Sequence, residues 1–199
     1  MTMKMLLAGV LGAVAMFVWT SIAHLALPLG EAGVAEIPNE QAVLAAMQSN
    51  MGEKAGLYIF PGPGLGPNAS SEEKHKAMEQ LEKDYGTKPS GILMYKPPGQ
   101  AFNFPKFLTI EFLTELAECL LAVFLLMQTR LAAFGARVVF VTVLGLLAAV
   151  ATNISYWNWY GFPTTYTASY MCIQIVGFLC AGLVIALVLK KSPAHSATA

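Results

Sequence analysis

Three glutamates in an otherwise apolar stretch are the residues best suited to chemistry. Glu111, Glu115 and Glu118 lie four and three residues apart within residues 108–124. At about 100° per residue in a helix they fall within an arc of roughly 60°, so they share one face. A carboxylate at the middle of a bilayer costs at least ~2.5 kcal/mol. We therefore expect this face to point into a helix bundle, toward a wet cavity, or against another protein.

Polar residues in the other apolar stretches are the expected partners of these glutamates. They are His24, Asn153 and Gln174. At ~1.5 Å of helical rise per residue, all three lie at about the depth of Glu111 or Glu115. Because ionisable residues within membrane spans are candidates for function, the sequence predicts one binding site formed by the glutamates and these partners. Hydrogen bonding between helices also accounts for Asn153 and Gln174, and an interfacial position also accounts for His24.

Two kinds of chemistry fit this site. Without a cation beside them, buried Glu115 and Glu118 would be neutral, and such a pair of carboxyl groups can carry protons. Carboxylates three and four residues apart, together with one histidine, can also bind a divalent cation. The Glu-x-x-His pair typical of metal sites in helical bundles is absent from the sequence. The metal is therefore left unknown, and neither a cofactor nor a catalytic residue is predicted.

The composition indicates that membrane helices must hold these residues. Only 12% of the 199 residues are charged and 56% are hydrophobic, whereas an ordinary soluble domain is about 25% charged. The mean hydropathy is +0.56. Four apolar runs are long enough to cross the ~30 Å hydrocarbon core of a bilayer, which makes the lipid bilayer the first predicted partner. The runs cover residues 5–27, 107–128, 138–156 and 170–189.

The positive charges predict the orientation of the chain. The basic residues that flank the runs are Lys4, Arg130, Arg137, Lys190 and Lys191. All of them fall on one side of the membrane, which the positive-inside rule makes the cytoplasm. Both termini are then cytoplasmic, including the tail 190–199, while the connections 28–106 and 157–169 lie outside. A cleaved signal peptide ending near residues 21–23 is the alternative for the first run, which is longer than a usual signal core. With no basic cluster, a nucleic-acid partner is excluded.

The long connection over residues 28–106 has the pattern of a small α/β cap. Asn39 can cap a first helix, and Ser70 with Glu73 forms a capping box for a second helix. After each helix comes a similar peptide that is typical of a short strand closed by a proline turn. The two peptides are GLYIFPGPG at 56–64 and GILMYKPPG at 91–99. The sequence therefore predicts two helix–strand units whose strands can pair.

The second connection, over residues 157–169, is predicted as an aromatic outer loop. Trp and Tyr are typical of a belt at the membrane interface, and residues 161–163 can turn the chain. Stacking of a lipid or quinone head group on these rings is the alternative.

Small residues in the first and fourth runs predict that these two helices are neighbours, because such residues allow close approach of two backbones. They are Ala8, Gly9, Gly12, Ala13, Gly177, Ala181, Gly182 and Ala186.

Three segments carry a resemblance to a known group of proteins. They read WTSIAHLALPLGEAG at 19–33, PNEQAVLAAM at 38–47 and NWYGFP at 158–163. Together they resemble an uncharacterised family of small bacterial inner-membrane proteins with four spans and no known activity. The resemblance implies a bacterial inner membrane, and hence a periplasmic cap. It assigns no catalytic residue.

The sequence thus predicts an all-α membrane protein, with four transmembrane helices and a small periplasmic α/β cap between helices 1 and 2. The first functional hypothesis is an acidic intramembrane site that binds or relays protons or cations. The second is a non-catalytic accessory or assembly subunit of a larger membrane complex, whose acidic face meets another membrane protein. An enzyme acting on a lipid or quinone ranks third, since the sequence has no redox motif such as Cys-x-x-Cys.

Overall fold

The computed structural model describes residues 2–190, so Lys191 and the rest of the predicted cytoplasmic tail lie outside the described residues. These residues form two compact units. The first combines the chain up to Ala35 with the chain from Asn103 onward, and the second is Glu36–Phe102. Each unit is described by itself below.

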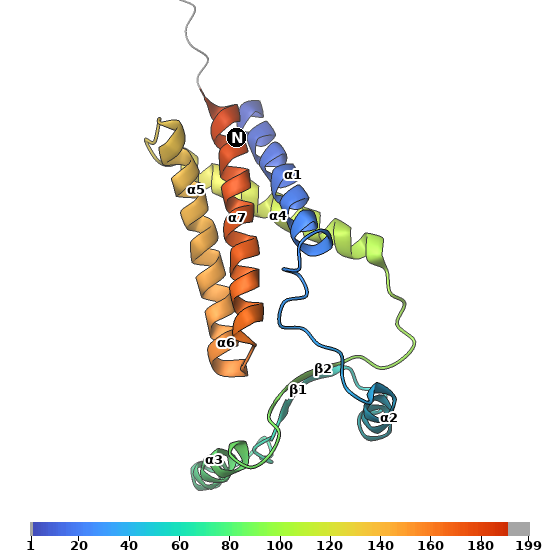
Figure 1. Ribbon diagram of the computed structural model, residues 1–199. Coiled ribbons are helices and arrows are strands. Elements are labelled where there is room, and N and C mark those ends of the chain that lie inside the picture. Colours follow the sequence, from blue (N-terminus) through green and yellow to red (C-terminus); the bar gives the residue numbers. More distant parts are fainter. Residues whose placement is uncertain (1, 191–199) are drawn as a thin grey trace, which may run out of the picture. The chain divides into compact units, whose positions relative to one another are not determined.

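The first unit is a bundle of long helices. In chain order they are α1 (Met3–Leu25), α4 (Phe104–Met127), α5 (Phe134–Ala149), η1 (Val150–Ile154), α6 (Ser155–Tyr160) and α7 (Thr164–Leu189). The elements α5, η1 and α6 form one continuous helix, Phe134–Tyr160. Figure 1 shows α1, α5 and α7 along a common direction, with α4 tilted away from it.

Within residues 2–190, three helices are long and apolar enough to cross a membrane, as expected for a multi-pass membrane protein. They are Met3–Leu25, Phe134–Tyr160 and Thr164–Leu189. The predicted span 107–128 forms as the helix α4, but α4 is not one of these three. The reason is its charge, because Glu111, Glu115 and Glu118 interrupt its apolar sequence.

Glycines bring the helices of this bundle close together, and they confirm that α1 and α7 are neighbours. A Cβ placed on Gly12 of α1 would meet Ile185 Cγ1 of α7 at 2.9 Å. Gly9 instead faces α4, where a Cβ would meet Leu120 Cδ2 at 2.6 Å. The small residues of α1 therefore serve two interfaces, which the sequence pattern did not separate.

Two basic side chains tie the helices together at one end of the bundle. Lys4 Nζ donates a hydrogen bond to the backbone oxygen of Lys190 at 2.9 Å. Arg137 Nη1 donates to the backbone oxygen of Leu189 at 3.0 Å. Cations near the last carbonyls of a helix satisfy groups that lack helical partners and interact favourably with the helix dipole. The starts of α1 and α5 thus lie at the C-terminal end of α7.

The aromatic connection is shorter than the sequence predicted. Residues up to Tyr160 belong to α6, and α7 begins at Thr164, so most of the segment predicted as a loop over 157–169 is helical. Gly161, with φ of +69°, ends α6 in the left-handed conformation that glycine adopts without strain. Pro163 then precedes the first turn of α7. Trp157 Nε1 donates to Thr164 Oγ1 at 3.1 Å across this turn.

The second unit contains α2 (Glu40–Met51), β1 (Gly56–Phe60), α3 (Ser71–Tyr85) and β2 (Gly91–Tyr95). The two repeated peptides do form strands, and they pair antiparallel from Gly56 opposite Tyr95 to Phe60 opposite Gly91. Tyr95 is the one buried apolar side chain among the described residues of this unit. Its hydroxyl donates to the backbone oxygen of Gly52 at 2.9 Å.

The predicted caps of the two helices have different outcomes. The capping box of α3 is confirmed, because Glu73 N donates to Ser70 Oγ at 3.2 Å and Ser70 N donates to Glu73 Oε2 at 2.7 Å. These bonds from Ser70, the backbone bond above all, hold the pKa of Glu73 below its ordinary value. The side-chain cap of α2 is wrong. Asn39 stands at the N-cap position with φ of 54°, and its side chain makes no capping bond.

Candidate functional site

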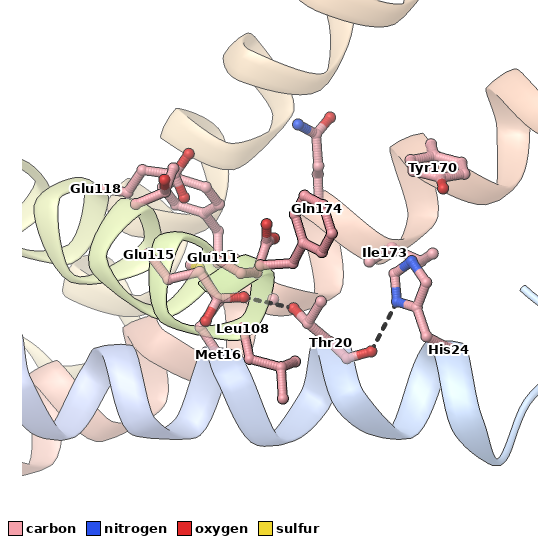
Figure 2. Close-up of a pocket in the computed structure, with 14 residues that line it drawn as sticks. Met16, Thr20, His24, Leu108, Glu111, Glu115, Glu118, Tyr170, Ile173 and Gln174 are labelled. Carbon is pink, nitrogen blue, oxygen red and sulfur yellow. Dashed lines mark hydrogen bonds between the residues drawn. The ribbon is translucent and has the colours of Figure 1, made fainter. Parts of the chain in front are cut away.

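A cavity of about 460 Å³ lies in the helix bundle, lined by residues of α1, α4 and α7. All three glutamates line it, with Glu115 between the other two in sequence. Across from α4, the lining residues include Thr20 and His24 of α1 and Gln174 of α7. Figure 2 shows the glutamates grouped toward one end of the cavity, with His24 and Tyr170 toward the other end.

The packing of α4 on α1 places Glu115 in this cavity. Cys119, one turn further along α4, is fully buried in the core with Ala8 and Met16 of α1. Because residues four apart lie on the same helix face, Glu115 is carried toward α1 as well. Only 4% of its surface is exposed. A side chain that the sequence placed in an apolar stretch is therefore buried against another helix.

The two carboxyl oxygens of Glu115 have different surroundings. Thr20 Oγ1 donates a hydrogen bond to Oε1 at 2.7 Å. The other oxygen, Oε2, is buried and accepts no hydrogen bond from any described residue. A buried polar atom without a partner is uncommon in a folded protein and calls for an explanation. Here the atom belongs to a buried acid that lines the cavity, and it has no donor among the described residues.

Thr20 also connects Glu115 to His24. The backbone oxygen of Thr20 lies 2.9 Å from Nδ1 of His24 (Figure 2). A carbonyl oxygen only accepts, so Nδ1 carries the hydrogen of this bond, and in the neutral ring Nε2 remains an acceptor. The His24 ring meets Tyr170 edge-on at 6.0 Å between centroids, and Tyr170 stacks on Tyr166 at 4.3 Å. An aromatic cluster therefore bounds the cavity beside His24.

Asn153 lies next to the cavity without lining it. Its Nδ2 donates to Gln174 Oε1 at 2.7 Å and to the backbone oxygen of Ala149 at 3.0 Å. Asn153 belongs to the π-helical turn Val150–Ile154 and is buried. Such turns are rare and often occur at functional sites. Asn153 thus holds Gln174, which is the lining residue, and the structure brings the other five predicted site residues to the cavity itself.

The charge of the cavity is one-sided. No lysine or arginine is among its lining residues within the described part of the chain. Within residues 2–190, no group of three or more His, Cys, Asp or Glu side chains converges closely enough to hold a metal ion. The glutamates are instead distributed by exposure, with Glu111 exposed, Glu118 half-buried and Glu115 buried. Among the described residues, no lysine or arginine side chain at the cavity balances these carboxyl groups.

Thr20 and Tyr170 are among the site residues that were not predicted from the sequence. Thr20 precedes His24 by four residues, so the helical period would have placed it on the same face. Tyr170 is the first residue of the predicted span 170–189 and directly follows the predicted aromatic loop. Its position beside His24 depends on the packing of α1 against α7, which no local pattern reveals.

Comparisons of the chain with protein-family models, with curated proteins and with solved structures find no match. The resemblance to a family of small four-span proteins therefore stays a prediction. What this cavity does must be inferred from its own residues and their geometry.

Proposed function

We propose that this protein is a small protein of the bacterial inner membrane that binds and releases protons or cations at Glu115. One observation carries the proposal. Glu115 is 4% exposed, one of its oxygens has no partner among the described residues, and no lysine or arginine lines its cavity. Burial of a carboxylate without a counterion costs roughly several kcal/mol of free energy. The site therefore needs either a proton on Glu115 or a cation beside it.

The proposal includes α4 as a membrane span, in addition to the three apolar helices. The starts of α1 and α5 lie at the same end of α7, where Lys4 and Arg137 bind its last carbonyls. The chain therefore has to return across the bundle between α1 and α5, and α4 is the helix of the first unit that can do so. Phe112 packs on Phe17, and Leu120 lies against Gly9, so α4 runs antiparallel to α1.

The same arrangement supports the predicted topology. Lys4, Arg137 and Lys190 gather at one end of the bundle, and the positive-inside rule makes this end cytoplasmic. The cavity is then near the periplasmic end of the bundle. His24 lies near the end of α1 and Tyr170 near the start of α7, both far from the end where Lys4 lies. The second unit, Glu36–Phe102, is part of the connection that would lie in the periplasm.

The exposures of the glutamates define a route for a proton. Glu111 is the most exposed of the three, Glu115 is buried, and Glu118 lies one further turn along the same helix face. A proton taken up at Glu111 can pass to Oε2 of Glu115, since this oxygen has no other partner. The Thr20 hydroxyl holds the second oxygen and fixes the orientation of the carboxyl group. His24 is linked to the same threonine through its backbone.

Flux measurements in proteoliposomes test the proposal. A pH-sensitive dye inside the vesicles would report proton movement after an external pH step, with and without a counter-cation. We expect Glu115→Gln and Glu118→Gln to abolish the flux, because an amide carries no exchangeable acid proton. Glu82→Gln, a change at an exposed glutamate of α3, is the control. Unchanged flux in both cavity variants, with circular dichroism equal to wild type, would contradict the proposal.

The second candidate is an accessory subunit of a membrane complex. It is favoured by the exposed position of Glu111 and by the partial coverage of α4, which packs mainly on α1. This candidate predicts co-purification of a second membrane protein in mild detergent and its loss on Glu111→Gln. Purification of a stable chain without a companion would count against it.

A further inference from the structure

The cavity is larger and more apolar than a site for a proton or a small inorganic ion requires. Its volume is about 460 Å³, within the ~300–1,000 Å³ typical of pockets for small organic molecules. Beside the glutamates, its lining includes Leu108, Ile173 and Phe178. A small hydrated ion gains nothing from such side chains. An organic molecule with an apolar body would bury its own surface against them.

We propose that the cavity binds a lipophilic organic cation, whose charge lies against Glu115 and whose apolar or aromatic body extends toward Tyr170. The proposal rests on the proposed function and names the substrate class of the same site. It is supported by the division of the polar groups in the cavity, with the three glutamates toward one end and His24 and Tyr170 toward the other (Figure 2). Bulky organic cations can bind by charge and stacking without the fixed ligand geometry that a metal ion needs.

The acidic end supplies the charge recognition. Oε2 of Glu115 is buried and without a partner among the described residues, and it belongs to a side chain that is 4% exposed. Glu111 and Glu118 lie one turn to either side of it and add to the negative potential. With no lysine or arginine lining the cavity in the described chain, an anion would be repelled and a neutral ligand would leave the carboxylates unbalanced.

The aromatic end supplies a surface for a flat apolar group. Tyr170 contacts two rings, His24 edge-on at 6.0 Å and Tyr166 stacked at 4.3 Å. A ring held in this way loses little conformational freedom when a ligand stacks on it. Ile173, one turn from Gly177 on α7, also lines the cavity and adds an apolar side chain beside Tyr170.

A proton and the organic cation would compete for Glu115. When the cation binds, the proton leaves Glu115 for water and the carboxylate pairs with the cation, so charge is conserved at the site. The other titratable groups that face this position are Glu111 and Glu118 on α4, His24 on α1 and Tyr170 on α7. Binding should therefore weaken as the pH falls, approaching about tenfold per pH unit for exchange of one proton.

Equilibrium dialysis of the full-length protein in lipid nanodiscs tests the proposal, with empty nanodiscs measured in parallel. The probe is tetraphenylphosphonium, and the control ligand is tetraphenylborate, which has a similar shape and the opposite charge. We expect the cation alone to bind above the lipid background. Glu115→Gln should weaken its binding at least ~30-fold, as expected for the loss of one partner of a buried charge pair. Glu82→Gln should bind as wild type does.

A second pair of variants tests the aromatic end. Tyr170→Leu should weaken binding of the cation roughly 2- to 10-fold, whereas Tyr170→Phe should retain it, because stacking needs the ring and not the hydroxyl. Equal binding by these two variants and wild type would overturn the placement of the ligand. Cation binding that is no stronger than the lipid background, or is unchanged in Glu115→Gln, would overturn the proposal.

The outcome is separable from that of the proposed function. Proton flux that depends on Glu115, without binding of tetraphenylphosphonium, would leave the proposed function standing and reject the organic cation. If the wild-type protein showed neither proton flux nor binding of tetraphenylphosphonium, both the proposed function and the organic-cation proposal would be rejected.

Discussion

The hydrogen bond between Thr20 and Glu115 is the contact on which the site depends most directly. Thr20→Val removes the hydroxyl while nearly preserving the shape of the side chain. Both oxygens of Glu115 would then lack a donor among the described residues, since Oε2 has none already. We expect the free energy of unfolding to fall, because a buried acceptor loses its only partner.

The size of this loss depends on the charge of Glu115. Side-chain hydrogen bonds between membrane helices contribute ~0.6 kcal/mol on average. Bonds to a charged group contribute about 1.5–3 kcal/mol. Because Glu115 is 4% exposed, little water can replace the hydroxyl from the protein surface. We therefore expect a loss of ~0.6 kcal/mol if Glu115 is neutral and about 2 kcal/mol if it is ionised.

Unfolding by SDS in mixed micelles, followed by tryptophan fluorescence, measures this loss. Trp19, which adjoins Thr20 and donates to the backbone oxygen of Ile173 at 2.9 Å, provides a local signal. Thr20→Ser is the matched control, because it keeps the hydroxyl and loses a methyl group. In a Glu115→Leu background the Thr20→Val change should cost little. Equal stability of wild type and Thr20→Val, or an equal cost in both backgrounds, would refute the reasoning.

Three further predictions concern other parts of the chain. Gly145→Ala should lower the free energy of unfolding by about 1–3 kcal/mol, because its Cβ would collide with a side chain of α7. Gly135→Ala, whose Cβ meets nothing within 4 Å, should be neutral or stabilising in the same unfolding assay. Amide protection factors in α3 should fall as the pH falls below ~4, because the pKa of Glu73 is lowered in the folded chain and its stabilising contribution disappears on protonation. Ser70→Ala should reduce this pH dependence and leave the part due to Asp84, whose pKa is also lowered by hydrogen bonds from Lys88 and Gln80. An undiminished dependence in that variant would contradict the assignment. Asn153→Ala should reduce but not abolish proton flux in proteoliposomes, because Asn153 acts only through its glutamine partner on α7. Complete loss of flux would mean that it touches the proton itself.

The sequence predicted the elements of this protein better than it predicted their packing. Apolar run lengths located the helices to within a few residues at most ends, because burial in lipid demands a minimum length. The repeated peptides located β1 and β2, since their strand and turn residues are local signals. The extension of α7 to Thr164 was missed, because aromatic residues are typical both of an interface and of a helix that ends there.

The candidate site was predictable as a set of residues but not as an arrangement. The glutamate face followed from the helical period alone, and its direction did not, because that direction depends on which side of α4 packs against α1. To predict Asn153 as the partner of Gln174, one would need to know that their two helices pack together. No residue pattern in the sequence indicated the π-helical turn that contains Asn153.

That π-helical turn has a consequence for the length of the chain. A π-helical turn in an α-helix holds one residue more than the α-helical turn it replaces. The helix Phe134–Tyr160 therefore contains a position where a residue can be deleted without rotating either flank out of register. Removal of Ala151 should leave the packing of α5 and the contact of Trp157 with Thr164 in place. We expect the shortened chain to stay folded, by circular dichroism and unfolding, and to lose the reach of Asn153 to Gln174. The single extra residue of the π-helical turn thus allows Asn153 to reach Gln174, which lines the cavity.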